Sequence, residues 1–151
     1  MTSTARSIYL ASPEGETGKS TIALGVLDLL TRRVQRVGVF RPVTRTAPSS
    51  VAGATAPVDG AGSAAAPGSA DRDYVLELLL AHDGVDLTYE EAMGVTYDDV
   101  HADPEAALAQ IVARYHDVAK QCDFVVIVGT DYTDVAGPTE LAFNADRKSV
   151  V

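Results

Sequence analysis

The stretch Ser12-Pro13-Glu14-Gly15-Glu16-Thr17-Gly18-Lys19-Ser20 decides the fold class of this chain. It follows a short β-rich run, Ser7–Ala11, and leads into Lys19–Arg33. In that segment the apolar residues Ile22, Ala23, Val26, Leu27 and Leu30 have the spacing of a helix with one buried face. Gly15 and Gly18 permit backbone conformations in which successive N–H groups point at one anion. The helix that follows adds its positive dipole end at the same place. The sequence therefore predicts a phosphate-binding loop between a first strand and a first helix.

The candidate nucleotide or phosphate site comprises the second half of this loop and the start of the helix. Its residues are Gly15, Glu16, Thr17, Gly18, Lys19, Ser20 and Thr21. Lys19 would reach the β- and γ-phosphates of ATP or of a regulatory nucleotide, and the Ser20 hydroxyl would ligate Mg²⁺. The usual spacing places a glycine where this chain has Pro13. The alternative is a tight strand-to-helix turn that contains Gly-Lys-Ser without binding a nucleotide.

Two further apolar runs predict strands of the same sheet, Val37–Val43 and Asp123–Val128. Continuous apolar strands separated by helices are typical of a parallel sheet that is covered on both faces. The fold class expected is therefore α/β, a doubly wound and mostly parallel sheet of the phosphate-loop type. Asp131 follows the second run and is a candidate Mg²⁺ ligand, because ligands in such folds bind beyond the carboxyl ends of the strands. The alternative is a solvated acid in a turn.

The rest of the chain is less regular. Residues 46–70 consist mainly of Ala, Gly, Pro and Ser, with Asp59 as the one charge, a composition that favours a flexible insertion. A helical face follows, with Tyr74, Val75, Leu78 and Leu79 expected to point inward, and residues 84–99 are expected to be irregular. Asp103-Pro104-Glu105 then predicts a helix start, with an N-cap, a proline at the first position and a first-turn acid. That helix should run to about Lys120.

Composition and charge exclude several classes of function. The 151 residues carry a net charge of −9, so no basic surface is available for a nucleic acid. No apolar stretch is long enough for a membrane span or a signal peptide. The single cysteine, Cys122, forms no internal disulfide, which is consistent with the cytoplasm. A small buried hydrophobic role fits this cysteine better than a nucleophilic one.

Residues 11–21 resemble the variant phosphate loop of the dethiobiotin synthetase-like ATPases, in which the leading glycine lies one residue earlier, here Ser12. Arg41-Pro42-Val43 resembles the basic-Pro-Val motif of that family. In those enzymes the strand equivalent to Phe124–Val128 ends in a glutamate suited to Mg²⁺, and this chain has Val128 there. The departure counts against an ATP-dependent ligase.

More specifically, residues 7–45, 113–121 and 123–144 are similar to the N-terminal domain of bacterial phosphate acetyltransferases. The resemblance implies a whole protein that uses acetyl-CoA and phosphate, with catalysis in a separate C-terminal domain. No catalytic residue is then expected in this chain, whose role would be assembly of a homo-oligomer and regulation by a metabolite. The alternatives are the ligase and a purely structural module with an empty loop.

The last residues suggest where this domain stops. Residues 1–145 are assigned to the accessory domain, while 146–151, Asp-Arg-Lys-Ser-Val-Val, match what one frame of a common sequencing adapter encodes. A genuine charged tail is the alternative. If the domain is cut at 145, the sheet is incomplete on its C-terminal side, with an unpaired edge. Such a fragment is expected to be poorly soluble or partly unfolded.

Overall fold

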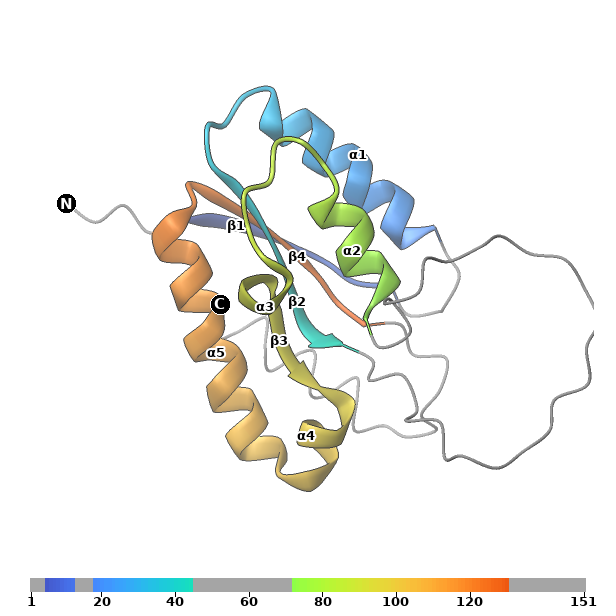
Figure 1. The fold of residues 1–151 in the computed structure, drawn as a ribbon, viewed down its shortest axis with the longest axis vertical. Helices are drawn as coiled ribbons and strands as arrows, with labels where there is room; N and C mark the ends of the chain where they lie inside the picture. The colour runs from blue at the N-terminus through green and yellow to red at the C-terminus, as the bar shows by residue number, and fades with distance from the viewer. Residues whose placement is uncertain (1–4, 13–17, 45–71, 131–151) are drawn as a thin grey trace, which may run out of the picture.

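The computed structural model describes residues 5–12, 18–44 and 72–130. The elements in chain order are β1 (Arg6–Leu10), α1 (Lys19–Thr31), β2 (Val37–Thr44), α2 (Tyr74–Leu80), α3 (Tyr89–Ala92), β3 (Met93–Thr96), α4 (Tyr97–Ala102), α5 (Pro104–Gln121) and β4 (Phe124–Val128). The strands form one parallel sheet in the order β1-β4-β2-β3 (Figure 1). The α/β class with a parallel sheet is confirmed.

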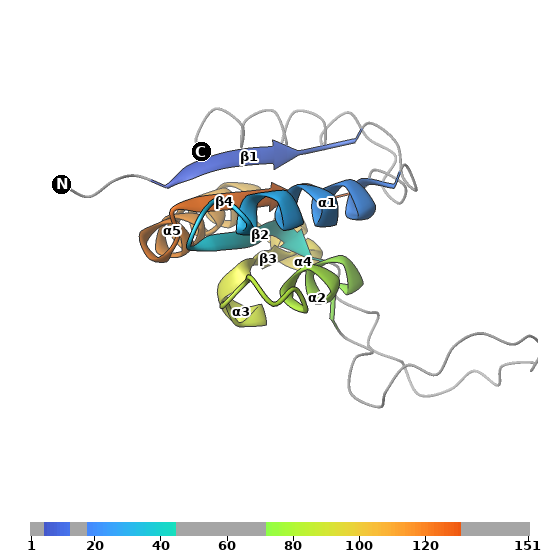
Figure 2. The same ribbon diagram turned by 90° about the horizontal axis from the view of Figure 1, so that it is seen from above.

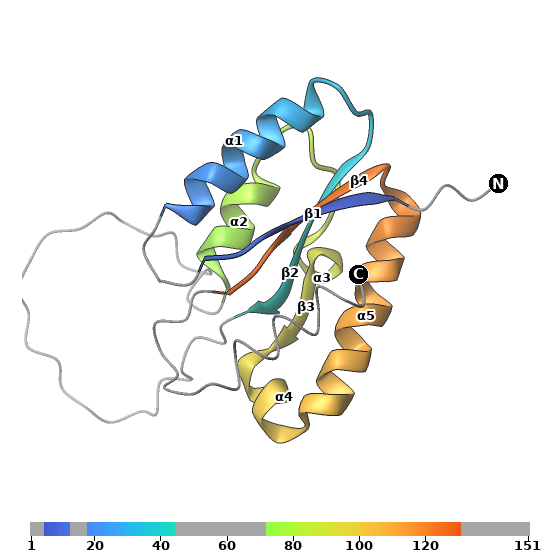
Figure 3. The same ribbon diagram turned by 180° about the vertical axis from the view of Figure 1, so that it is seen from behind.

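Helices cover both faces of the sheet, as parallel pairing requires. Figure 1 shows α1 and α2 on one side and α5 on the other, and Figure 3 shows the same layers from behind. The view from above follows the strands from β1 at one edge to β3 at the other (Figure 2). The α1 connection passes the position of β4, and the α5 connection passes that of β2. The predicted doubly wound arrangement is therefore present in the described residues.

Each face of the sheet has its own hydrophobic cluster, because neighbouring strand residues point to opposite sides. On β4, Val125 and Ile127 face α5, whereas Val126 and Val128 face α1 and α2. Phe40 packs edge-on against Tyr115 of α5, with 5.9 Å between the ring centroids. The helices contribute these buried residues: Ala23 and Leu27 of α1, Leu76 and Leu79 of α2, and Ile111, Tyr115 and Val118 of α5.

Two residues predicted to point inward do not. Ile22 is 58% exposed, because the buried stripe of α1 is centred on Ala23 and Leu27, one residue further round the helix. Tyr74 is 71% exposed as the first residue of α2. An apolar run fixes the helical period more securely than the angle at which the helix docks.

The prediction that residues 84–99 are irregular is wrong, since α3 and β3 lie within this range and α4 begins there. Capping boxes begin both short helices, one at Thr88 and one at Thr96. The strand between them pairs with β2 so closely that a Cβ on Gly94 would lie 2.1 Å from the Pro42 carbonyl oxygen. Elements as short as α3 and β3 are stabilised by contacts with the rest of the fold. They are too short to show a helical or strand periodicity in the sequence.

The helix predicted from Asp103 is confirmed as α5. The Asp103 side chain accepts from the Ala106 N–H at 3.0 Å, and Pro104 occupies the first turn. The insertion at 46–70 and the tail at 146–151 lie outside the described residues. Within the part that is described, no helix is both long and apolar enough to cross a bilayer.

Candidate anion site at the carboxyl edge of the sheet

Buried polar and charged residues gather at one edge of the molecule. In the described residues they are Ser12, Lys19, Arg41, Thr44, Asp73 and Thr130. Each lies near the carboxyl end of a strand or at the start of a helix on the same edge. Burying a polar group is costly unless it has partners, so such a concentration marks a specialised region. Open parallel sheets bind ligands at this edge.

The β1–α1 connection reaches this edge at Gly18, which has a φ of +74°, a left-handed conformation that favours glycine. Lys19 follows as the first residue of α1 and is 7% exposed, with its ammonium nitrogen shielded from solvent. Ser20 is half-buried and Thr21 is exposed. Gly15, Glu16, Thr17 and Asp131 lie outside the described residues. A binding role for these residues stays a prediction.

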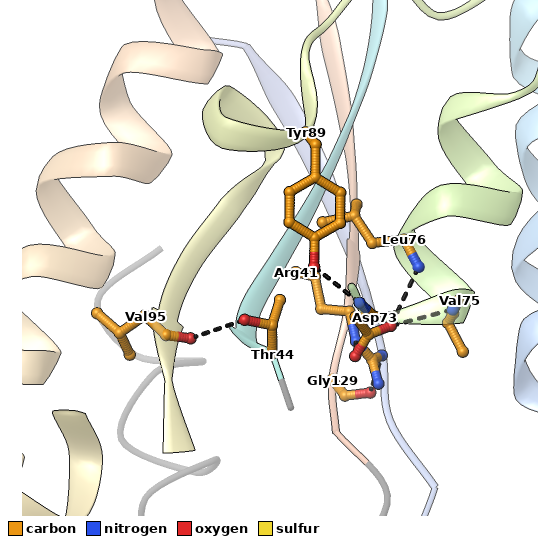
Figure 4. Close-up of polar contacts among 8 residues, drawn as sticks. All are labelled: Arg41, Thr44, Asp73, Val75, Leu76, Tyr89, Val95 and Gly129. Atoms are coloured by element: carbon orange, nitrogen blue, oxygen red, sulfur yellow. Dashed lines mark hydrogen bonds and ion pairs between the residues drawn. The ribbon is translucent and has the colours of Figure 1, made fainter. Parts of the chain in front are cut away.

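The second cation of the edge is Arg41, near the end of β2. Its Nε donates to Asp73 Oδ2 at 2.7 Å, and an Nη donates to the Gly129 carbonyl oxygen at 3.2 Å (Figure 4). The side chains of Arg41 and Asp73 are 5% and 4% exposed. A charge pair this deeply buried is shielded from salt and from solvent.

Asp73 is fixed by contacts that do not involve Arg41. Its Oδ1 accepts from the N–H groups of Val75 and Leu76 at 3.0 and 3.1 Å, which caps α2. Its own N–H donates to the Tyr89 hydroxyl oxygen at 2.8 Å. Burial raises the pKa of Tyr89, so this hydroxyl stays protonated well above neutral pH. Asp73 therefore connects β2 and α2 through its carboxylate and α3 through its backbone N–H.

Gly129 brings β1 close to the Arg41 guanidinium. Its N–H donates to the Leu10 carbonyl oxygen at 2.9 Å, while its own carbonyl oxygen accepts from Arg41. A Cβ at this position would lie 2.8 Å from the Tyr9 hydroxyl oxygen. A larger residue immediately after β4 would therefore require the Tyr9 ring to shift.

The buried charges of this edge suit an anion. Among the described residues, the buried charged groups at this edge are Lys19, Arg41 and Asp73. A buried cation attracts an anion more strongly than the same charge on the surface.

The described residues of this edge suit Mg²⁺ less well than an anion. Strand β4 ends in the fully buried Val128, and both oxygens of Asp73 are already engaged. No group of three or more His, Cys, Asp or Glu side chains that could hold a metal occurs in the described ranges. Of the two predicted metal ligands, Ser20 lies beside the edge, and Asp131 falls outside the described residues.

Comparison with known proteins places this architecture in a family. A family model described as "AAA domain" matches residues 6–147. The chain belongs to this AAA domain family. It is also 28% identical over 144 residues to a phosphate acetyltransferase of Nitratidesulfovibrio vulgaris, and 28% identical over 150 residues to one of Synechocystis sp..

These alignments cover 92% and 96% of the chain, and in both cases 18% of the relative. The chain thus spans less than a fifth of the length of these relatives. The predicted resemblance to a phosphate acetyltransferase domain is confirmed.

Two residues of the candidate site were not predicted from the sequence. Arg41 was part of a recognised motif, but its partners Asp73 and Tyr89 were not identified. Asp73 carried a usable signal, since an aspartate immediately before an apolar helical segment is a common N-cap pattern. Tyr89 carried none, because only the packing of α3 against α2 brings its hydroxyl to Asp73.

Proposed function

We propose that this chain is an accessory domain of a phosphate acetyltransferase whose carboxyl edge binds a phosphate-bearing metabolite. The whole protein would move an acetyl group from acetyl-CoA to phosphate, giving acetyl phosphate and CoA. That chemistry would take place outside this domain, and the metabolite would regulate it. The observation that carries the proposal is that Lys19 and Arg41 are both buried at this edge, with Lys19 directly after the left-handed Gly18.

The geometry supports binding through preorganisation. Lys19 is already buried at the first turn of α1, so a ligand need not immobilise a freely rotating lysine. The backbone N–H groups of that turn and the helix dipole act on the same position. Phosphate oxygens accept hydrogen bonds from both kinds of donor.

A dethiobiotin synthetase-like ligase is a weaker candidate. Such a reaction needs Mg²⁺ beside the γ-phosphate, and the residue at the end of β4 is the apolar Val128. A structural module that supports a homo-oligomer, with an empty loop, is the other alternative. Ligand titration separates it from the proposal.

The test is calorimetric titration of the chain with ATP and with pyrophosphate, each with and without Mg²⁺. Lys19→Met keeps the length of the side chain and removes its charge. It should weaken binding by about tenfold or more, because a charge-assisted contact to phosphate is lost. Lys120→Met is the matched control, since Lys120 is exposed on α5 and pairs with Asp117.

Circular dichroism on each variant would establish that the fold is retained. Lack of binding to the unmodified chain, or equal binding by Lys19→Met, would favour the structural module. In the complete protein, the ligand that binds should also change the rate of acetyl transfer.

A further inference from the structure

We infer that this chain consists of two interlocked pieces, a first piece before residue 45 and a second piece after residue 71, which fold only together and stay together without the peptide link between them. The inference is independent of the proposed function and follows from the order of the strands. The first piece supplies β1 and β2, and the second supplies β3 and β4. In the sheet these strands alternate, because their order is β1-β4-β2-β3 (Figure 2).

This alternation leaves neither piece with a strand pair of its own. Strand β1 pairs with β4, β4 with β2, and β2 with β3, so every strand pairing among the described residues joins one piece to the other. A strand without a neighbour leaves its backbone N–H and C=O groups unpaired, which is costly where the strand is buried. All eight residues of β2 are buried, and a strand of the second piece lies on each side of it. The sheet is therefore itself the interface between the two pieces.

The hydrophobic clusters on the two faces of the sheet are shared in the same way. On one face, Phe40 of β2 packs edge-on against Tyr115 of α5. On the other face, Leu27 of α1 shares a cluster with Leu76 of α2 and Val126 of β4. A piece by itself would expose its part of both clusters to water, and burial of apolar surface is the main favourable term in folding. Each piece thus depends on the other for its core as well as for its strand pairing.

Buried polar contacts join the two pieces close to the point where the chain leaves one and enters the other. Arg41 lies three residues before the end of β2, and Asp73 is the second residue of the second piece. The Arg41 Nε donates to Asp73 Oδ2 at 2.7 Å (Figure 4). Thr44, the last residue of β2, donates from Oγ1 to the Val95 carbonyl oxygen at 3.3 Å. These contacts hold both ends of the connection in place whatever sequence joins them.

The start of the second piece is also anchored from within that piece. The Cζ atom of Arg72 lies 4.7 Å from the centroid of the Tyr89 ring, and its Nη2 lies 3.2 Å from Glu90 Oε1. A link between two pieces that already bind each other acts through their effective concentration, which changes slowly with the length of the link. We therefore expect the link to raise the stability of the fold without determining it.

The experiment produces the protein as two polypeptides, residues 1–60 and 61–151, which are co-expressed with an affinity tag on the first only. Together they contain every residue of the chain and lack one peptide bond. We expect the tagged polypeptide to retain the other in equal amounts, and the complex to show the circular dichroism spectrum of the intact chain. Because the complex unfolds into two molecules, its thermal midpoint should rise with protein concentration, whereas that of the intact chain should not.

A substitution in each Arg–Asp pair that joins the pieces tests which contacts hold them together. Arg41→Met should weaken their association by about a hundredfold or more, because the buried Asp73 carboxylate loses its cation. Arg36→Met is the matched control, since Arg36 pairs with Asp123 across the same two pieces at the same 2.7 Å distance but in exposed positions. It should weaken the association by about fivefold at most. Dilution of each complex, followed by circular dichroism, measures both affinities.

Polypeptides that do not co-purify are mixed in urea and refolded together, so that poor accumulation of one of them does not decide the outcome. Polypeptides that assemble by neither route would overturn the inference, as would a tagged polypeptide that has the native spectrum without its partner. Equal affinities of the Arg41→Met and Arg36→Met complexes would overturn the role given to the buried pair. Ligand binding enters none of these measurements, so the proposed function stands or falls separately.

Discussion

Two Arg–Asp pairs lie at opposite ends of β2 and differ mainly in their surroundings. Arg36 and Asp123 precede β2 and β4, and their closest N–O distance is 2.7 Å, the same as for Arg41 and Asp73. The side chains of the first pair are 61% and 43% exposed, whereas those of the second are 5% and 4% exposed. Equal geometry therefore does not imply an equal energetic role.

At the exposed end, backbone hydrogen bonds determine how β2 and β4 pair. The Arg36 carbonyl oxygen accepts from the N–H groups of Asp123 and Phe124, which sets the starting register of β2 and β4. The side-chain pair adds to an arrangement that is already fixed, and water can solvate both charges if it breaks. At the buried end, the charges have no such alternative, so each depends on the other.

Among the variants of the two pairs, Arg41→Met should lower the free energy of unfolding most. It leaves the Asp73 carboxylate buried without its cation, which typically costs about 3–5 kcal/mol. We expect roughly 3 kcal/mol here, because the two N-cap hydrogen bonds to Asp73 remain. Urea denaturation would measure the loss. Arg36→Met is the matched control, and its unfolding midpoint should barely change.

The double variant Arg41→Met with Asp73→Asn sharpens that prediction. It removes both buried charges while an N-cap is retained, so it should be more stable than Arg41→Met alone. A double variant that is less stable than both single variants would show that the charges do not compensate one another.

Tyr89→Phe, at the buried end, should cause an intermediate loss of stability. The Asp73 N–H would lose its hydrogen-bond acceptor in a partly buried position, at a cost of about 1–2 kcal/mol. Thermal unfolding monitored by circular dichroism would detect this. Tyr74→Phe is the control, because that ring is 71% exposed, and equal losses in the two variants would contradict the assigned role of the Tyr89 hydroxyl.

Asp123→Asn should give the smallest loss of stability, and that loss should disappear in acid. The hydrogen bond from Arg36 holds the pKa of Asp123 below its usual range. A carboxyl whose pKa is lower in the folded state stabilises the fold above its unfolded pKa, and this contribution is lost as pH falls through the folded pKa. The two chains should therefore differ at neutral pH and converge below about pH 4. A difference that persists at lower pH would mean that the pair is not the cause.

The elements with strong sequence signals were predicted within a few residues. Apolar runs indicated β1, β2 and β4, and the Asp103-Pro104 cap located the start of α5. Strand β3 was missed because its four residues become a strand only by pairing with β2.

The residues of the candidate site also differ in whether a local motif predicted them. Gly18 and Lys19 were predicted from spacing, since the chemistry of a phosphate loop is local and leaves a motif. The contact between Asp73 and Arg41 joins residues 32 positions apart, and no local pattern encodes it.

The sequence alone determined the class of fold and the family resemblance, because both depend on periodicity and short motifs that each segment carries by itself. The tertiary structure alone decided where the buried charges meet. Strand order brings β4 between β1 and β2, and this places Gly129 within reach of both Leu10 and Arg41. Docking of α2 then delivers Asp73 to the guanidinium. Such a site depends on packing between distant segments, which the order of residues does not reveal.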